Sequence, residues 1–140
     1  MSGMDEKTLE TLRAAARKAA GNGYAPYSKF RVGAALLLDD GSVVTGCNVE
    51  NISYGLTSCA ERNALFRAIS EGGPGRRIRA CAVASRDGAP CSPCGACRQV
   101  MSEFVTPDAM VCFSDRNGPQ TRRFAELFPF TFAFQPETEA

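Results

Sequence analysis

Two cysteines in a C-x-x-C spacing, Cys94 and Cys97, are the strongest chemical signal in the sequence. They follow Pro93 at a predicted helix start, where both sulfurs can turn towards one point, as tetrahedral zinc requires. The positive end of a helix also favours thiolate over thiol. The simpler alternative is a pair of buried or incidental thiols, since a lone C-x-x-C is common.

Cys59 supplies a third potential ligand, again at a predicted helix start. One cysteine plus the C-x-x-C pair gives the three ligands typical of a catalytic zinc, whose fourth position stays open for water. A closed structural site needs a fourth ligand, and the remaining candidates are Cys47, Cys81, Cys91 and Cys112. Cys81 and Cys112 lie in apolar, strand-like runs and are predicted core residues. Cys91 gives a ferredoxin-like spacing, but the cysteine-proline that should follow is missing, which argues against an iron–sulfur cluster.

The complete absence of histidine restricts the mechanism further. It excludes Ser–His triads, Cys–His proteases and HExxH metal sites, so a carboxylate, Lys, Tyr, Cys or water must move any proton. Glu61, two residues after Cys59, is the candidate for this role. The alternative is a structural one, because an acidic residue in the first turn of a helix is favoured by the helix dipole alone.

Three thiolates around Zn²⁺ leave one net negative charge, which weakens the metal as a Lewis acid. Arg62 and Arg98 flank the ligand motifs, and we expect them to donate hydrogen bonds to the sulfurs and so restore the acidity of the metal. For both arginines the alternative is an ordinary surface position. Gln99 is a further candidate for orienting a ligand.

Charge and composition favour a small-molecule substrate. The chain has 16 basic and 15 acidic residues, a net charge of +1, without the basic excess typical of proteins that bind long nucleic acids. Its 140 residues, 44% hydrophobic and 22% charged, fit one soluble domain over residues 1–140. Residues 1–20 are too charged for a signal peptide, and no apolar run is long enough for a membrane span. We therefore expect a cytoplasmic protein with reduced thiols.

The elements that must position these residues follow from apolar periodicity and turn residues. The pattern predicts, in order, a helix capped by Asp5, a hairpin of strands 32–38 and 43–49, a helix 59–70, a strand 78–84, a helix 94–104, a strand 109–113 and a short helix 121–127. Helix and strand alternate after the hairpin, which predicts a sheet with helices on both faces, an α/β sandwich.

Three longer segments, together with Cys-Ala-Glu at 59–61, resemble the small zinc-dependent cytidine deaminases. They read YAPYSKF at 24–30, GCNVEN at 46–51 and PCGACRQ at 93–99. The resemblance extends from about residue 8 to residue 132. It implies a three-layer α/β/α sandwich with a mixed central sheet, a homotetramer with shared active sites, and one zinc per chain held by Cys59, Cys94 and Cys97.

The same resemblance implies the activity. It is hydrolytic deamination of cytidine and deoxycytidine to uridine and deoxyuridine, the chemistry of pyrimidine salvage. Zinc-bound hydroxide would attack the base, and Glu61 would take the proton of the water and deliver protons to the base and its amino group. The substrate is then a nucleoside and not a nucleic acid polymer.

Substrate contacts are implied residue by residue. Phe30 would pack on the pyrimidine ring, Asn48 and Glu50 would hydrogen-bond the ribose, Ala60 would line the base site, and Tyr54 and Phe132 would reach a neighbouring subunit's site. Read without the resemblance, Phe30 is equally a core residue at the start of a strand. The tail departs from the family pattern after Pro129, so Phe130 or Phe134 is an alternative to Phe132.

Two other functions fit the same residues. One is a deaminase of a modified pyrimidine nucleoside, such as a blasticidin-type antibiotic, although the intact Phe30, Asn48 and Glu50 favour plain cytidine. The other is a non-catalytic structural zinc protein, in which Cys91 closes the coordination sphere.

Overall fold

A mixed five-stranded sheet forms the centre of the computed structural model, which describes residues 4–132. The strand order is β2-β1-β3-β4-β5, and β3 and β4 are the one parallel pair of this sheet. The strands are β1 (Val32–Leu38), β2 (Val43–Cys47), β3 (Ile78–Ser85), β4 (Val105–Asp115) and β5 (Gly118–Arg123). The predicted hairpin is therefore confirmed as β1 and β2, which pair antiparallel.

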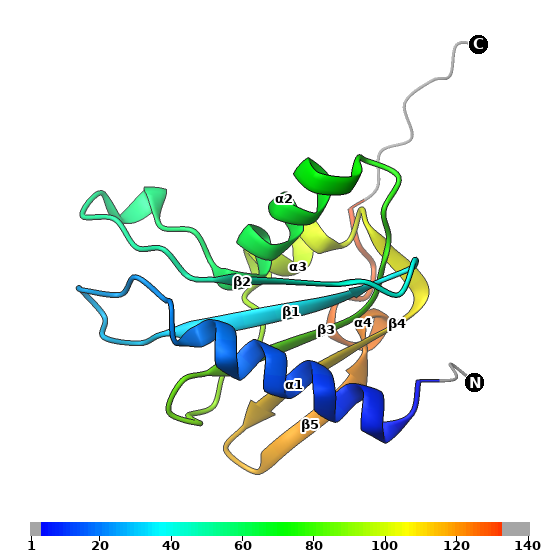
Figure 1. Cartoon of the computed structure of the whole chain (residues 1–140), viewed down its shortest axis with the longest axis horizontal. Coiled ribbons are helices and arrows are strands. Elements are labelled where there is room, and N and C mark those ends of the chain that lie inside the picture. The colour runs from blue at the N-terminus through cyan, green and yellow to red at the C-terminus, as the bar shows by residue number, and fades with distance from the viewer. Residues whose placement is uncertain (1–3, 133–140) are drawn as a thin grey trace.

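Helices cover both faces of the sheet (Figure 1). Helix α1 (Glu6–Ala20) lies on one face, while α2 (Ala60–Gly72), α3 (Gly95–Met101) and α4 (Phe124–Leu127) pack on the other. The predicted three-layer α/β/α sandwich with a mixed central sheet is confirmed. Asp5 caps α1 as expected, since its Oδ1 accepts a hydrogen bond from the Thr8 N–H at 2.8 Å.

Every residue of β1 is buried, because both faces of this strand are covered. Ala35 and Leu37 pack in the cluster that contains the α1 residues, whereas Leu36 and Leu38 pack in the cluster beneath α2. This two-sided burial explains why the segment reads as a continuous apolar run without polar alternation. Cys81 and Cys112 are fully buried in the same sheet, so their predicted core positions are confirmed.

Two glycines set how closely the helices approach the sheet. A Cβ atom on Gly33 would lie 2.0 Å from the Ala16 carbonyl oxygen of α1. A Cβ atom on Gly46 would lie 2.5 Å from the Ala64 nitrogen and 2.8 Å from the Ala60 carbonyl oxygen of α2. Each helix backbone therefore rests directly on a strand backbone, and Gly46 determines the position of the helix start that follows Cys59.

The C-terminal part differs from the prediction. Residues 118–123 form β5, which pairs antiparallel with β4, so only 124–127 of the predicted helix 121–127 are helical. This edge strand is polar and lacks the alternation that identifies strands. Strand β4 begins at Val105, earlier than predicted, because an irregularity opposite Ile78–Ala80 accommodates Pro107. Within residues 4–132, no helix has both the length and the apolarity to cross a membrane.

Candidate active site

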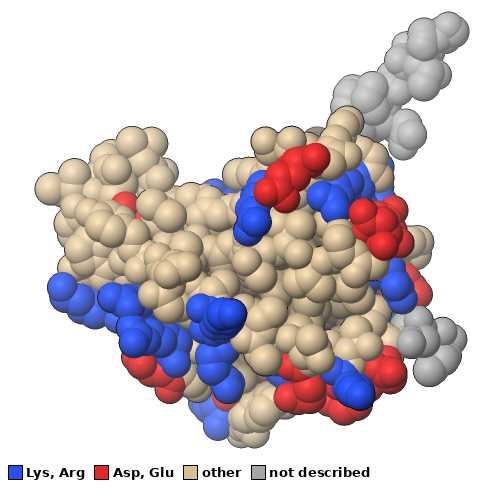
Figure 2. Space-filling view, in the orientation of Figure 1, with Lys and Arg blue, Asp and Glu red and all other residues tan. Residues whose placement is uncertain are grey.

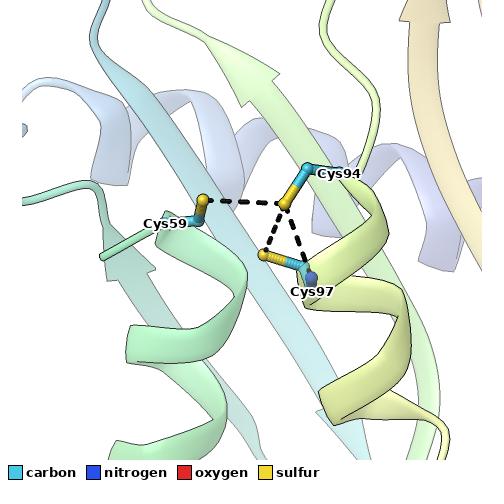
Figure 3. A group of neighbouring side chains, drawn as sticks. All are labelled: Cys59, Cys94 and Cys97. Carbon is cyan, nitrogen blue, oxygen red and sulfur yellow. Dashed lines mark hydrogen bonds between the residues drawn. The ribbon is translucent and has the colours of Figure 1, made fainter. Parts of the chain in front are cut away.

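Three cysteine sulfurs meet on the α2 and α3 side of the sheet (Figure 3). The Cys94 Sγ lies 3.8 Å from the Cys59 Sγ and 3.4 Å from the Cys97 Sγ, and all three sulfurs lie within 4.8 Å of one another. Zn–S bonds of about 2.3 Å at tetrahedral angles require S–S separations of about 3.8 Å. The donor set and its spacing therefore fit a zinc ion.

Helix starts position these sulfurs. Cys59 is the N-cap residue of α2 and Cys94 is the N-cap residue of α3, and both have extended backbone angles. Cys97 lies one turn into α3, and its N–H donates to the Cys94 Sγ at 3.4 Å. Backbone N–H groups at a helix start stabilise negative charge, so both helix starts favour thiolates at this point.

The pKa values of Cys59 and Cys97 are shifted in opposite directions. Hydrogen bonds from the Cys97 thiol and from Arg62 lower the pKa of Cys59 to about 5. The Cys59 thiolate and burial raise the pKa of Cys97 well above its usual range. Of this pair, Cys59 is thus the stronger acid and Cys97 the weaker. A bound metal ion would displace the remaining protons.

Cys91 stands apart from this cluster. Among the described residues, the group that could hold a metal ion consists of Cys59, Cys94 and Cys97, and Cys91 is not a member. It is half-buried beside them, and burial, followed by the charges of Glu61 and Cys59, raises its pKa to about 12. Its position, outside the group of sulfurs that lie within 4.8 Å of one another, separates Cys91 from the candidate ligands.

Glu61 is buried next to the sulfurs, with only 3% of its surface exposed. Burial raises the pKa of Glu61 to about 7, and the Cys59 thiolate adds to this effect. A carboxyl group with a pKa near neutrality can both accept and release a proton at working pH. This is the property that proton transfer to and from a substrate requires.

Of the two predicted arginine donors, Arg62 contacts a sulfur and Arg98 does not. The Arg62 Nη2 donates to the Cys59 Sγ at 3.3 Å. The Arg98 side chain donates instead to two backbone carbonyls, those of Pro93 and Leu127, both at 2.8 Å. Arg98 therefore fixes the turn before Cys94 and donates no hydrogen bond to a sulfur among the described residues. The difference arises because the side chain folds back along α3 towards the neighbouring loop.

No side-chain hydrogen bond of Gln99 is present within residues 4–132; its carbonyl accepts from the Ser102 hydroxyl at 2.6 Å and from the Ser102 N–H at 3.3 Å. The structure thus gives Gln99 no contact with a ligand sulfur.

A pocket of about 260 Å³ opens beside the sulfurs and Glu61. It brings together several predicted site residues, namely Phe30, Asn48, Glu50, Cys59, Ala60, Glu61 and Cys94. A second pocket of about 430 Å³ shares Ser28, Glu50 and Thr57 with the first and continues towards Tyr54. A small molecule can therefore extend from the sulfurs to the open rim.

The two polar residues predicted to bind a sugar already hold the chain. Asn48 is buried; its Oδ1 accepts from the Val32 N–H at 3.0 Å, and its Nδ2 donates to the Phe30 carbonyl at 2.8 Å. The Glu50 Oε1 accepts from the Tyr27 and Ser28 N–H groups, each at 3.1 Å. Both side chains thus fasten the segment before β1 to the end of β2.

Two predicted aromatic contacts lie outside the pocket that holds the sulfurs. Tyr54 belongs to a short 3₁₀ helix, η1 (Tyr54–Leu56), and is 87% exposed. Phe130 and Phe132 are also exposed, and Phe134 lies outside the described residues. In the described part of the chain the rings of Tyr54, Phe130 and Phe132 make no part of the pocket wall beside Glu61.

Asn63 was not predicted and supports the ligand position. Its Nδ2 donates to the Cys47 carbonyl at 2.7 Å, and its Oδ1 accepts from the Ser58 hydroxyl at 2.7 Å. These bonds tie the residue before Cys59 to the end of β2. The available signal was its place four residues after Cys59, on the same side of the predicted helix.

Comparisons with known proteins agree with this geometry. The family described as the cytidine and deoxycytidylate deaminase zinc-binding region matches residues 6–113. The cytidine deaminase of Halalkalibacterium halodurans is 49% identical over 130 residues, which cover 92% of this chain and 95% of that protein. The cytidine deaminase of Mycobacterium tuberculosis H37Rv is 46% identical over 129 residues, or 92% of both chains.

Solved structures show the same fold. The crystal structure of the Mycobacterium tuberculosis cytidine deaminase superposes with a TM-score of 0.78 at 44% identity, covering 90% of this chain and 98% of that one. The cytidine deaminase of Burkholderia pseudomallei gives a TM-score of 0.79 at 45% identity, covering 92% and 100%. With the family match and these relatives spanning nearly the whole chain, the protein belongs to the cytidine and deoxycytidylate deaminase family.

Proposed function

We propose that the protein deaminates cytidine and deoxycytidine hydrolytically, with zinc held by Cys59, Cys94 and Cys97. One observation carries the proposal: a cluster of three cysteine sulfurs, two of which (Cys59 and Cys94) line a small pocket, lies beside the buried carboxyl group of Glu61, whose pKa burial raises to about 7. The relatives named cytidine deaminases support the substrate.

Each residue would have a definite task in the reaction. Zinc, when bound, would supply a Lewis acid that makes water acidic enough to attack C4 of the pyrimidine at neutral pH. Glu61 would carry both protons of the attacking water in turn, the first to N3 and the second, released as the C4 carbonyl forms, to the departing amino group. Arg62 would offset the excess negative charge of the three thiolates through its bond to Cys59.

The pocket walls suit a nucleoside. Phe30 would stack on the pyrimidine ring, and Ala60, at the start of α2, would line the base site. Asn48 and Glu50 would face the ribose, and the binding energy of the sugar would position the base against the water. Since the 3′-hydroxyl occurs in both cytidine and deoxycytidine, a contact there would accept both nucleosides.

Self-association would complete the site. The segment after β2 projects from the body, and Figure 2 shows this projection almost free of charged side chains. Its large apolar residues Ile52, Tyr54 and Leu56 are at least 71% exposed. We propose that copies of the chain cover them in a homotetramer, where Tyr54 or Phe132 reaches a neighbouring pocket. A reducing compartment such as the cytoplasm, and a role in pyrimidine salvage, fit free thiols and a free nucleoside substrate.

An absorbance assay tests the proposed function. Purified protein should convert cytidine and deoxycytidine, convert cytosine and adenosine poorly, and lose activity when a chelator removes the metal. Absence of cytidine turnover in zinc-loaded protein would overturn the proposal. Turnover of a blasticidin-type antibiotic in preference to cytidine would assign a different substrate to the same site.

A further inference from the structure

We propose that Ser28 is a positioning residue that sets the sugar-binding carboxylate and the aromatic wall of the pocket as one unit. The inference rests on the proposed function, since it assigns Glu50 to the sugar and Phe30 to the base. Ser28 lines both pockets described above, the one beside the sulfurs and the one that opens towards Tyr54.

A single hydroxyl joins the two walls. The Ser28 Oγ donates to the Glu50 Oε2 and accepts a hydrogen bond from the Phe30 N–H at 3.0 Å. The direction of the Glu50 carboxylate and the backbone of Phe30 are therefore linked through one atom. Loss of that hydroxyl would release both at once.

The conformation of Lys29 makes this link possible. Its φ angle is +64°, in the left-handed region that residues with a side chain rarely adopt. The reversal brings the Phe30 N–H back onto the Ser28 hydroxyl, and the Lys29 N–H donates to the Ala25 carbonyl at 2.9 Å. Unfavourable backbone conformations of this kind persist where surrounding bonds fix them, often at functional sites.

One hydrogen-bond acceptor position of the Glu50 carboxylate has no partner among the described residues and can accept from a sugar hydroxyl. A carboxylate has about four acceptor positions, two on each oxygen. Oε1 already accepts two backbone N–H groups, from Tyr27 and Ser28, whereas Oε2 accepts the Ser28 hydroxyl. The remaining position is on Oε2, and Ser28 determines where it points. The hydroxyl that binds Glu50 should therefore bind Oε2.

Asn48 secures the other side of the aromatic residue. Its side chain holds the Phe30 carbonyl at 2.8 Å, while Ser28 holds the Phe30 N–H. Asn48 and Glu50 both come from the segment that follows β2, and Val49 between them pairs with Ser58, directly before Cys59. The Phe30 backbone and the Glu50 carboxylate are thus held by the chain segment that also pairs with the residue before Cys59.

The test compares Ser28→Ala with the parent enzyme on two substrates, cytidine and 3′-deoxycytidine. For cytidine the KM should rise about 10-fold while kcat changes little, because a hydrogen bond that orients a charged acceptor is lost and the zinc site remains. For 3′-deoxycytidine, which lacks the hydroxyl assigned to Glu50, the loss in kcat/KM should be clearly smaller. Ser28→Thr keeps the hydroxyl and should restore most of the cytidine KM.

Ser42→Ala is the matched control, because Ser42 also donates its hydroxyl to a carboxylate in a turn, that of Asp40 at 2.6 Å, away from both pockets. It should leave both KM values unchanged, and thermal melting should show that each variant folds. Equal losses of kcat/KM on the two substrates, or an unchanged cytidine KM, would overturn the assignment of Ser28. Absence of cytidine turnover in the parent protein would instead overturn the proposed function, and this inference with it.

Discussion

Gly46→Ala should damage catalysis through the position of α2. A Cβ atom at this site would lie 2.5 Å from the Ala64 nitrogen, and ordinary contact begins at about 3.4 Å, so the helix must retreat by about 0.9 Å. The first turn of α2 carries Glu61 and follows the ligand Cys59. A misplacement of about 1 Å typically costs on the order of 100-fold in rate. We therefore expect kcat to fall about 100-fold in zinc-saturated protein.

Gly33→Ala supplies the matched comparison on the opposite face of the sheet. Its added Cβ would lie 2.0 Å from the Ala16 carbonyl oxygen of α1, a closer clash than at Gly46. Overpacking of this kind typically costs about 1–3 kcal/mol of unfolding free energy. Because α1 contributes no residue to the pocket beside Glu61, Gly33→Ala should lower the melting temperature with little change in kcat per zinc-loaded molecule.

Calorimetry, zinc analysis and the cytidine absorbance assay separate the two effects. Gly46→Ala should lose far more activity than its loss of stability explains, and Gly33→Ala should show the reverse. If zinc-saturated Gly46→Ala keeps kcat within threefold of the parent, Gly46 is not needed to hold α2, and with it Glu61, in the position that catalysis requires. An equal loss of kcat in Gly33→Ala would mean that general destabilisation accounts for both.

Four further predictions concern the cluster and its neighbours. Cys59→Ala should lose zinc while Cys91→Ala keeps it, as elemental analysis will show; zinc loss from Cys91→Ala would favour a closed four-cysteine site. Glu61→Gln should retain zinc but lose at least 100-fold in kcat. Burial raises the pKa of Glu61 from 4.5 to about 7, so the folded metal-free protein binds the proton more tightly than the unfolded chain, and stability falls as pH rises between these values. Between pH 5 and pH 8 the parent should therefore lose up to about 3 kcal/mol of unfolding free energy relative to Glu61→Gln, a comparison in which the opposite contribution of the Cys59 thiol cancels, and an identical pH dependence in both proteins would refute the shift. Arg62→Ala should raise the pH needed for half-maximal zinc binding, because the pKa of Cys59 rises when the hydrogen bond from Arg62 is lost. Arg98→Ala should lower only the melting temperature, because Arg98 donates to backbone carbonyls. Equal shifts of the zinc-binding pH in the two variants would contradict this difference in contacts.

Local sequence signals were sufficient to predict the cluster of three cysteines and the main helices and strands. Cys59 and Cys94 could be placed because each begins a helix, and helix starts are marked by nearby turn residues and by the apolar period that follows. Strand β1 was recognisable from its continuous apolar run. These features depend on neighbours in the sequence, so spacing alone predicts them.

Features that depend on distant contacts could not be predicted in this way. The Arg98 side chain reaches the Leu127 carbonyl, a partner far along the chain, and nothing in its flanking residues indicates that choice. Glu50 was expected to face a sugar, but its bonds to Ser28 and Tyr27 require the loop reversal at Lys29. Strand β5 has no apolar pattern because it is a polar edge strand, and only its pairing with β4 defines it.

The 3.4 Å separation of the Cys94 and Cys97 sulfurs has a consequence for handling the protein. Without a metal ion, two neighbouring thiols in a C-x-x-C segment are readily oxidised to a disulfide once one of them is a thiolate. That bond would remove two of three ligands together, so air exposure after chelation should inactivate the protein in a way that zinc alone cannot reverse. A reductant followed by zinc should restore it. A bound metal ion would thus also protect these thiols from oxidation.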